Sequence, residues 1–243
     1  MDGTLTRTDT FLAYLKFALM KRKSRLAGCA HLPLAVALFR GGYRSRDWLK
    51  QEFVRAILGG GSKSQIDSWT ADFVTLQGAG LLKPGALAAL RWHQDRGDRL
   101  IIASASLDIY TTALAVAWGV PEVVCTKLDW QNGILTGRLN GPNLRGEAKV
   151  TAVKQILLNT PGSTPEIFAY SDDYSDLPLL RLADHGFAVD PTRKLANCAA
   201  REGLQILGWK RRPRRFAFGR AKLESETPFQ QRERVQLAFH NHS

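Results

Sequence analysis

From Lys83 onwards, the sequence alternates short apolar runs with segments of helical character, and this alternation restricts the chain to few folds. The candidate strands span 98–103, 122–126, 166–170 and 186–189, and the candidate helices span 85–94, 107–118, 147–158 and 177–183. Asn132-Gly133 adds a hairpin, because this dipeptide suits a primed turn. Strands that alternate with helices favour a parallel sheet covered on both faces, with ligands beyond the carboxyl ends of the strands. The pattern therefore predicts an α/β fold, with any functional site at that edge.

Residues 10–82 have a different pattern: apolar and polar residues do not alternate there over a length that would indicate a strand. We expect helices at 11–20, 46–58 and 64–76, the last with Ser64 as its N-cap. The sequence thus predicts a core built from 1–9 and 83–208, with 10–82 inserted as a helical cap.

Residues 209–243 are rich in charge and poor in periodicity, which predicts a solvated basic tail. The alternative is an arm that binds membranes or phosphates, because Trp209, Phe216 and Phe218 are interleaved with arginines. We favour the solvated tail.

The positive charge of the chain, net +12, lies mainly in the predicted cap and tail. The cap carries 11 basic and 4 acidic residues, the tail carries 9 and 3, and the rest is close to neutral. Basic surfaces attract phosphates, nucleic acid or anionic lipid, and charge alone does not choose among them. The apolar stretch 26–39 is too short to cross a bilayer. We favour a buried cap helix for it; the alternative is a segment at a membrane interface, since basic residues precede it.

The cysteines indicate the redox setting. Cys29, Cys125 and Cys198 are far apart, and no Cys-x-x-Cys or Cys/His cluster accompanies them. A disulfide scaffold or a thiolate zinc site is therefore not expected. No signal peptide is recognisable, so the sequence predicts a reducing, cytoplasmic location.

Four short motifs fall at the predicted ends of strands or helices. They are Asp2-Gly3-Thr4-Leu5-Thr6, Ser104, Lys149, and Asp172-Asp173 with Asp176. Taken singly, each has an ordinary structural explanation, such as a helix cap, a turn or a solvated lysine. Taken together, they form the set that phosphoryl transfer needs, because carboxylates hold Mg²⁺ while a lysine, a hydroxyl and backbone N–H groups bind phosphoryl oxygens. Their order along the chain therefore predicts a phosphoryl-transfer site.

With these motifs in this order, the sequence resembles the haloacid dehalogenase-like phosphatases over roughly residues 1–208, in the phosphoserine-phosphatase-like branch whose helical cap lies between the first two motifs. Asp2-Gly3-Thr4 matches the end of the DxDGT motif, Ser104 the second motif and Lys149 the third. Residues 171–176 match GDxxxD, with Ser171 in place of glycine and Asp173 where a serine is common.

The resemblance places the nucleophilic aspartate of DxDGT immediately before Met1, since Asp2 matches the second aspartate of that motif. It implies that the first, central strand of the core is missing too, which leaves two unpaired sheet edges. We favour a sequence truncated before Met1. The alternative is a true short form that cannot perform the usual chemistry.

The activity implied by the resemblance is Mg²⁺-dependent hydrolysis of phosphomonoesters through an aspartyl-phosphate. Asp2 and Lys149 would be catalytic, Asp2 as proton donor and then as base. Gly3, Thr4, Ser104 and Lys149 would bind the phosphate. Mg²⁺ would be held by the nucleophile, by the backbone carbonyl of Asp2 and by the carboxylate of Asp172, and Asp176 would support the metal shell or orient Lys149. Asp9 is either an acid that recognises an amino group of the substrate or a helix cap, and the role of Asp173 stays open.

The expected substrate is a small-molecule or a lipid phosphate ester. The basic, partly apolar cap is similar to that of phosphatidylglycerophosphate phosphatases, which implies a site peripheral to the inner face of a membrane. An alternative function is a non-catalytic protein of this fold that binds anionic lipid or nucleic acid, although nucleic acid is the less favoured partner. A third is phosphotransfer to an alcohol instead of water.

Overall fold

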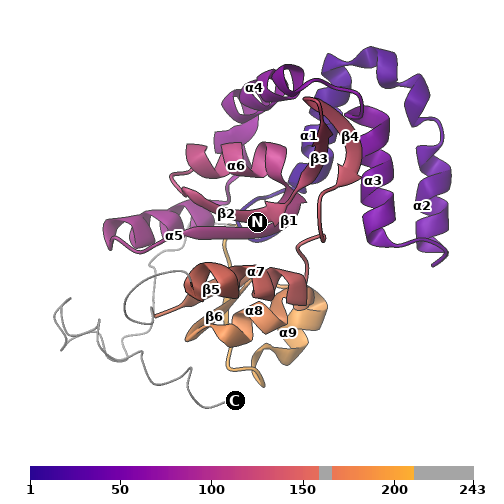
Figure 1. Ribbon diagram of the computed structural model, residues 1–243. Helices are drawn as coiled ribbons and strands as arrows, with labels where there is room; N and C mark the ends of the chain where they lie inside the picture. The colour runs from indigo at the N-terminus through magenta and orange to yellow at the C-terminus, as the bar shows by residue number, and fades with distance from the viewer. Residues whose placement is uncertain (159–165, 211–243) are drawn as a thin grey trace, which may run out of the picture.

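The structure, a computed structural model, describes residues 1–158 and 166–210 of the chain. The helices in this part are α1 (Thr10–Lys21), α2 (Leu32–Arg40), α3 (Arg46–Ile57), α4 (Lys63–Leu81), α5 (Pro84–Asp95), α6 (Asp108–Ala117), α7 (Glu147–Leu158), α8 (Leu177–Leu182) and α9 (Arg193–Ala199), with short 3-10 turns η1 (Lys23–Arg25), η2 (Ala27–Cys29) and η3 (Tyr174–Asp176). The strands are β1 (Ile101–Leu107), β2 (Glu122–Thr126), β3 (Leu128–Gln131), β4 (Ile134–Leu139), β5 (Phe168–Ser171), β6 (His185–Val189) and β7 (Gln205–Leu207). Figure 1 shows the arrangement of these elements.

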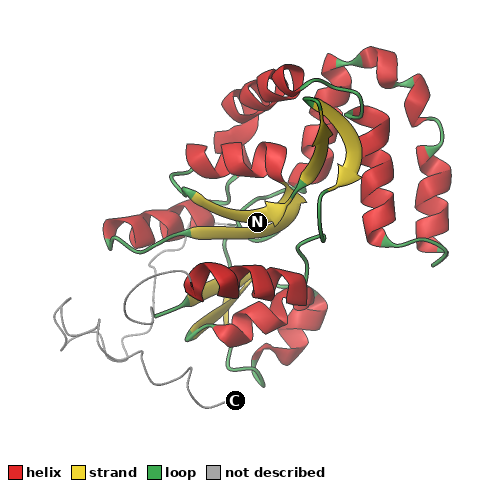
Figure 2. Cartoon of the chain, in the orientation of Figure 1, coloured by secondary structure: helices red, strands yellow, loops and turns green. Residues whose placement is uncertain are grey.

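The parallel strands form two small sheets. β1 pairs with β2, and β5, β6 and β7 form a second parallel sheet in that order. Figure 2 shows the two as separate groups of strands, and α6 and α7 lie on opposite sides of the β1–β2 pair in Figure 1. The predicted α/β fold with parallel strands is confirmed. Among the described strands, however, β1 and β5 each have one edge without a partner strand, so the sheet is not continuous.

Several predicted boundaries were wrong: among them, α4 ends at Leu81 and not at residue 76, and β5 spans Phe168–Ser171 and not 166–170. The strand expected at 98–103 runs three residues later and continues to Leu107, so Ser104 lies within β1 instead of following it. The N-cap of α4 is Ser62 and not Ser64, because Ser62 accepts a hydrogen bond from the backbone of Gln65 and the Gln65 side chain accepts one in return. This reciprocal capping box fixes the helix start two residues earlier.

The C-terminal end of the described chain also differs from the prediction. The sequence indicated no element after the strand at 186–189, but α9 and β7 follow, and β7 pairs with β6. Trp209, which we assigned to the solvated tail, is buried at 1% exposure against Tyr170. A side chain at Gly85 would clash with the Trp209 ring, so the two residues fit closely. The rest of the predicted tail, 211–243, lies outside the described residues.

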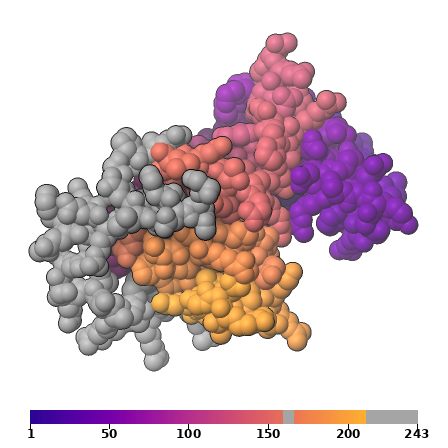
Figure 3. Space-filling view, turned by 60° about the horizontal axis from the view of Figure 1, so that its bottom comes forward, coloured from indigo at the N-terminus to yellow at the C-terminus, as the bar shows by residue number. Residues whose placement is uncertain are grey.

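Aromatic side chains of the helical segment 10–81 pack against helix α6 of the α/β part. The Tyr14 ring of α1 lies 5.3 Å from Phe73 of α4 and 4.9 Å from Tyr110 of α6 (ring centroids). All three side chains are fully buried, and the Tyr14 hydroxyl is hydrogen-bonded to Thr70. Figure 3 shows that the remainder of this segment projects as a lobe at one side of the molecule.

The β3–β4 hairpin contacts the same helical segment through backbone hydrogen bonds. Asn132 and Gly133 both have positive φ, 51° and 74°, which confirms the predicted primed turn. The backbone N–H of Gly60 donates to Leu135, and that of Lys63 donates to Gly133, so the hairpin holds the turn between α3 and α4. Figure 1 shows the hairpin beside α3.

Candidate active site

The side chains of the four motifs meet at one pocket of about 620 Å³ between the helical segment and the carboxyl-terminal half of β1. The residues of the predicted set that line it are Asp2, Gly3, Ser104, Lys149, Asp172 and Asp176. Thr4 does not line the pocket: it is buried behind the wall, and its hydroxyl donates to Asp172 Oδ1 at 2.7 Å. The arrangement brings the predicted chemistry together and gives Thr4 a positioning contact to a carboxylate.

Asp2 is held in one orientation by donors on both of its oxygens. The backbone N–H and the hydroxyl of Thr10 donate to Oδ1 at 2.9 and 2.6 Å, and the hydroxyl of Ser106 donates to Oδ2. Thr10 is the first residue of α1, so the start of this helix fixes the acid that begins the chain's first motif. A carboxylate fixed in this way can exchange a proton with a group in the pocket without first reorienting.

Lys149 is aimed by Asp176. Its ammonium donates to both oxygens of Asp176 at 2.7 Å, and Ser171 donates to the same carboxylate at 2.8 Å. Lys149 is 5% exposed, in the first turn of α7. Since Asp176 is thus fully engaged, the geometry favours the orienting role for it over a metal-binding role.

Gly3 and Asp172 lie in direct contact. Gly3 has a φ of 72°, and a Cβ at this position would overlap Asp172 Oδ2. Glycine is therefore needed both for the backbone conformation and for the space that the carboxylate occupies. Burial raises the pKa of Asp172, against the hydrogen bond from Thr4. Because burial disfavours the charged form of this carboxylate, a cation beside it would stabilise that form.

The carboxylates that line the pocket are the candidate ligands for Mg²⁺. Among the residues that the structure describes, no three His, Cys, Asp or Glu side chains converge as a metal cluster. Asp2 and Asp176 accept hydrogen bonds on both carboxylate oxygens, whereas Asp172 accepts one side-chain hydrogen bond, from Thr4 at Oδ1. Mg²⁺ is often bound by one or two carboxylates and keeps several waters. The residues therefore fit Mg²⁺ with Asp172 as a carboxylate ligand beside backbone oxygens and water.

The α-amino group of Met1 lies inside this cluster. Its pKa is lowered by burial and then by the charge of Lys149, while Asp2, Asp176 and Asp172 act in the opposite direction. Met1 thus lies between the carboxylates and the lysine of the pocket.

Asp9 and Asp173 also line the pocket, and the structure gives both of them structural contacts. Asp9 caps α1 by accepting from the backbone of Leu12, and burial raises its pKa. Asp173 accepts from the backbone of Ser175 and pairs with Arg145 at 3.0 Å. Burial alone would raise the pKa of Asp173, but these hydrogen bonds and the arginine lower it.

Comparison with known proteins agrees with this geometry. The family model of haloacid dehalogenase-like hydrolases matches residues 1–181. The chain belongs to this family. It is 31% identical to Protein CicA of Caulobacter vibrioides over 184 residues, 75% of this chain and 80% of that protein. It is 26% identical to a histidinol-phosphatase of Neisseria meningitidis over 217 residues, 86% of this chain and 96% of that protein.

Solved structures in the family share the fold. A substrate-bound phosphoserine phosphatase superposes with a TM-score of 0.58 at 15% identity, covering 87% of this chain and 90% of that one. The predicted resemblance to the phosphoserine-phosphatase-like branch is confirmed. The family membership and the phosphatase among the curated relatives support phosphoester hydrolysis as the general chemistry of this chain.

Sequence reasoning missed several residues of the site. Ser106 could have been found, because it follows Ser104 by two residues in a strand and so shares its face. Lys50, Asn143 and Arg46 line the pocket from segments for which the sequence offered no motif. Their place follows from how the helical segment packs on the core.

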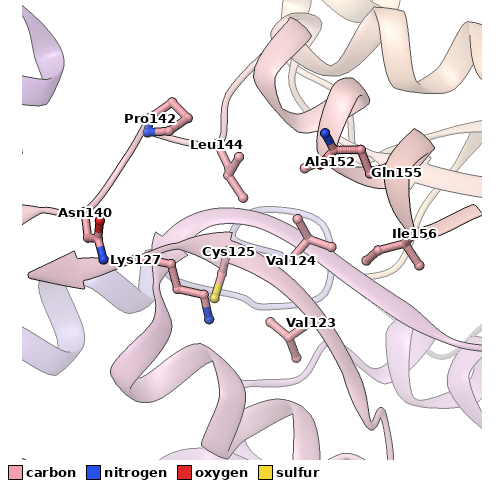
Figure 4. A pocket seen from close by; sticks show the side chains of 10 residues that line it. All are labelled: Val123, Val124, Cys125, Lys127, Asn140, Pro142, Leu144, Ala152, Gln155 and Ile156. Atoms are coloured by element: carbon pink, nitrogen blue, oxygen red, sulfur yellow. The ribbon is translucent and has the colours of Figure 1, made fainter. Parts of the chain in front are cut away.

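A second hollow of about 410 Å³ lies between β2 and α7 (Figure 4). Its lining residues are Val123, Val124, Cys125, Lys127, Asn140, Pro142, Leu144, Ala152, Gln155 and Ile156. It contains no carboxylate, and burial raises the pKa of the Cys125 thiol to about 11, so this thiol is a poor nucleophile at neutral pH. The three cysteines are free, in line with the prediction of no disulfide.

Proposed function

We propose that this chain is a phosphatase of the Mg²⁺-dependent type, with residues 1–9 and 83–208 as its core and 10–82 as its cap. The observation that carries the proposal is the convergence of Asp2, Ser104, Lys149 and Asp172 on one pocket. A hydroxyl, an ammonium and two carboxylates at one place are what cleavage of a phosphate ester requires.

In the proposed reaction, Ser104 and Lys149 hold the phosphoryl oxygens. Ser104 Oγ accepts from the backbone of Ser106, which leaves its hydrogen for the substrate. Asp2 gives a proton to the leaving oxygen and later takes one from the attacking water. Mg²⁺ bound at Asp172 would offset negative charge on the phosphoryl group. An aspartate directly before Met1 would be the nucleophile, as the family motif implies.

The test uses the 243-residue chain and two versions extended before Met1 by an apolar strand that ends in Asp or, as matched control, in Asn. We expect the Asp version to hydrolyse p-nitrophenyl phosphate with Mg²⁺ and the Asn version to be slower by at least about 100-fold. Equal rates in both versions would refute the nucleophile. If the Asp version folds but hydrolyses none of a panel of phosphate esters, the proposed function is wrong.

Exposed apolar side chains within residues 20–34 support peripheral membrane binding, which we also propose as an additional property. Met20, Leu26 and Leu34 are 65%, 57% and 64% exposed, and Lys21–Arg25 adds positive charge beside them. Apolar side chains next to basic ones suit an anionic lipid surface. Within the described residues, no helix has the length and apolarity that crossing a membrane requires.

Co-sedimentation with vesicles tests this proposal. We expect the chain to bind vesicles that contain anionic phospholipid at physiological salt, and Leu34→Asp to reduce the bound fraction at least about fivefold. Leu158→Asp is the control, because Leu158 is 73% exposed and lies on α7, in the α/β part of the chain. An equal loss in both variants, or no binding by the unaltered chain, would argue against membrane association.

A further inference from the structure

Helix α3 directs two positive side chains into the pocket, beyond the lysine that the phosphoryl group uses. Arg46 and Lys50 are four residues apart, so they lie on the same face of the helix, and both line the pocket. Two other cations of the pocket pair with carboxylates: Lys149 with Asp176 and Arg145 with Asp173. Among the described residues, neither α3 cation has a carboxylate within 4.0 Å.

Lys50 is fixed at the border of the helical segment and the core. Its Nζ donates to Ala105 O and to Asn143 Oδ1, both at 2.6 Å. Asn143 in turn donates to Asp47 of α3 at 2.7 Å. An ammonium has three N–H donors, so one remains for a group in the pocket. Ala105 directly follows Ser104, which places this donor beside the predicted phosphoryl site.

The surroundings of Lys50 favour an anion. Burial lowers its pKa to about 8, although Asp47 and Asp2 act in the opposite direction. The wall on this side is otherwise mainly apolar, with Phe11, Leu49 and Phe53. A cation with little water around it and no anion in contact gains most from an anionic ligand.

We propose that Lys50, assisted by Arg46, binds a second anionic group of the substrate, so that the preferred phosphate ester carries a carboxylate or a further phosphate on its alcohol part. The inference rests on the proposed function, because it takes Ser104 and Lys149 as the site of the first phosphoryl group. The alcohol part would then lie between α3 and β1, with its second negative charge toward the helical segment.

Three non-hydrolysable ligands test this directly: propylphosphonate, 3-phosphonopropionate and 1,3-propanebisphosphonate. They share a short chain and one phosphonate, and differ in having no second anion, a carboxylate or a second phosphonate. Dissociation constants are measured by calorimetry with Mg²⁺ for the 243-residue chain and for Lys50→Met, Lys50→Arg and Arg44→Met. Arg44 is the matched control, since it is an exposed cation that precedes α3 and does not line the pocket.

We expect at least one of the two probes with a second anionic group to bind about tenfold more tightly than propylphosphonate. The reason is that a charge-assisted hydrogen bond from Lys50 to this group replaces one to water. Lys50→Met should reduce this ratio to about two or less while propylphosphonate binds as before, and Lys50→Arg and Arg44→Met should retain it. The probe that shows the larger ratio identifies the anion as carboxylate or phosphate.

A ratio near one in the unaltered chain, or a ratio that survives Lys50→Met, overturns the inference alone. Failure of all three ligands to bind overturns the proposed function as well, since the phosphoryl site itself would then be absent. Melting temperatures of the variants separate a folding defect from a change in selectivity: Lys50→Arg keeps the charge and provides the comparison if Lys50→Met unfolds.

Discussion

Asp172→Asn is expected to remove the response of the protein to Mg²⁺. The substitution keeps the shape of the side chain and its contact with Thr4, but removes the negative charge that the metal would neutralise. Mg²⁺ should no longer raise the melting temperature, and hydrolysis by the Asp-extended version should fall by at least about 100-fold. Both effects are large because, among the described residues, Asp172 accepts a side-chain hydrogen bond from Thr4 at Oδ1 alone, while both oxygens of Asp2 and Asp176 are occupied.

The adjacent residue provides a matched control for this prediction. Asp173 pairs with Arg145 and caps the turn at Ser175, and asparagine can retain the cap. Asp173→Asn should therefore change the affinity for Mg²⁺ by about threefold or less. Equal losses in the two variants would mean that general negative potential, and not coordination by Asp172, holds the metal. Near-normal turnover in Asp172→Asn would contradict its proposed role.

Lys83→Met is expected to have the largest effect on stability. Lys83 is 3% exposed between α4 and α5, where its ammonium donates to the carbonyl of Gly3 and pairs with Asp190 at 2.8 Å. Loss of the lysine leaves a buried carboxylate without its cation and the motif loop without its anchor. Breaking such a pair costs about 3–5 kcal/mol, so the free energy of unfolding in urea should fall by that amount.

An exposed pair shows what the same substitution does without burial. Lys63 pairs with Asp67 on α4, and both side chains are more than half exposed. Lys63→Met should change the free energy of unfolding by about 0.5 kcal/mol or less, because water screens such pairs. If Lys83→Met were equally mild, the contact with Gly3 would have no part in holding the loop.

The elements that the sequence predicted well carry strong local signals. The strand at 122–126 and the helix at 147–158 were predicted with the bounds that the structure has, since each is a short apolar or amphipathic run between turn residues. β7 and α9 were missed because three and seven residues give too little periodicity to recognise. Trp209 was misassigned because its neighbours in sequence are basic, while its burial is decided by distant residues such as Gly85.

The same division holds for the site. Asp2, Ser104, Lys149 and Asp172 could be predicted because they fall in motifs of known order. Their hydrogen bonds could not: that Asp176 would be fully engaged by Lys149, and Thr4 by Asp172, depends on the packing of α7 and β5. Lys50 reaches the pocket only because α3 lies against the loop at Asn143, a tertiary contact without a sequence signature.

The aromatic contacts of Tyr14 with Phe73 and Tyr110 have a thermodynamic consequence. They join helices from the inserted segment to a helix of the α/β part through three fully buried side chains. Two bodies that share buried side chains lose those contacts at the same moment when either one melts. The calorimetric and van't Hoff enthalpies of unfolding should therefore coincide, as for one cooperative unit. This is expected even though the chain leaves the α/β part at Thr10 and returns to it 72 residues later, at Leu82.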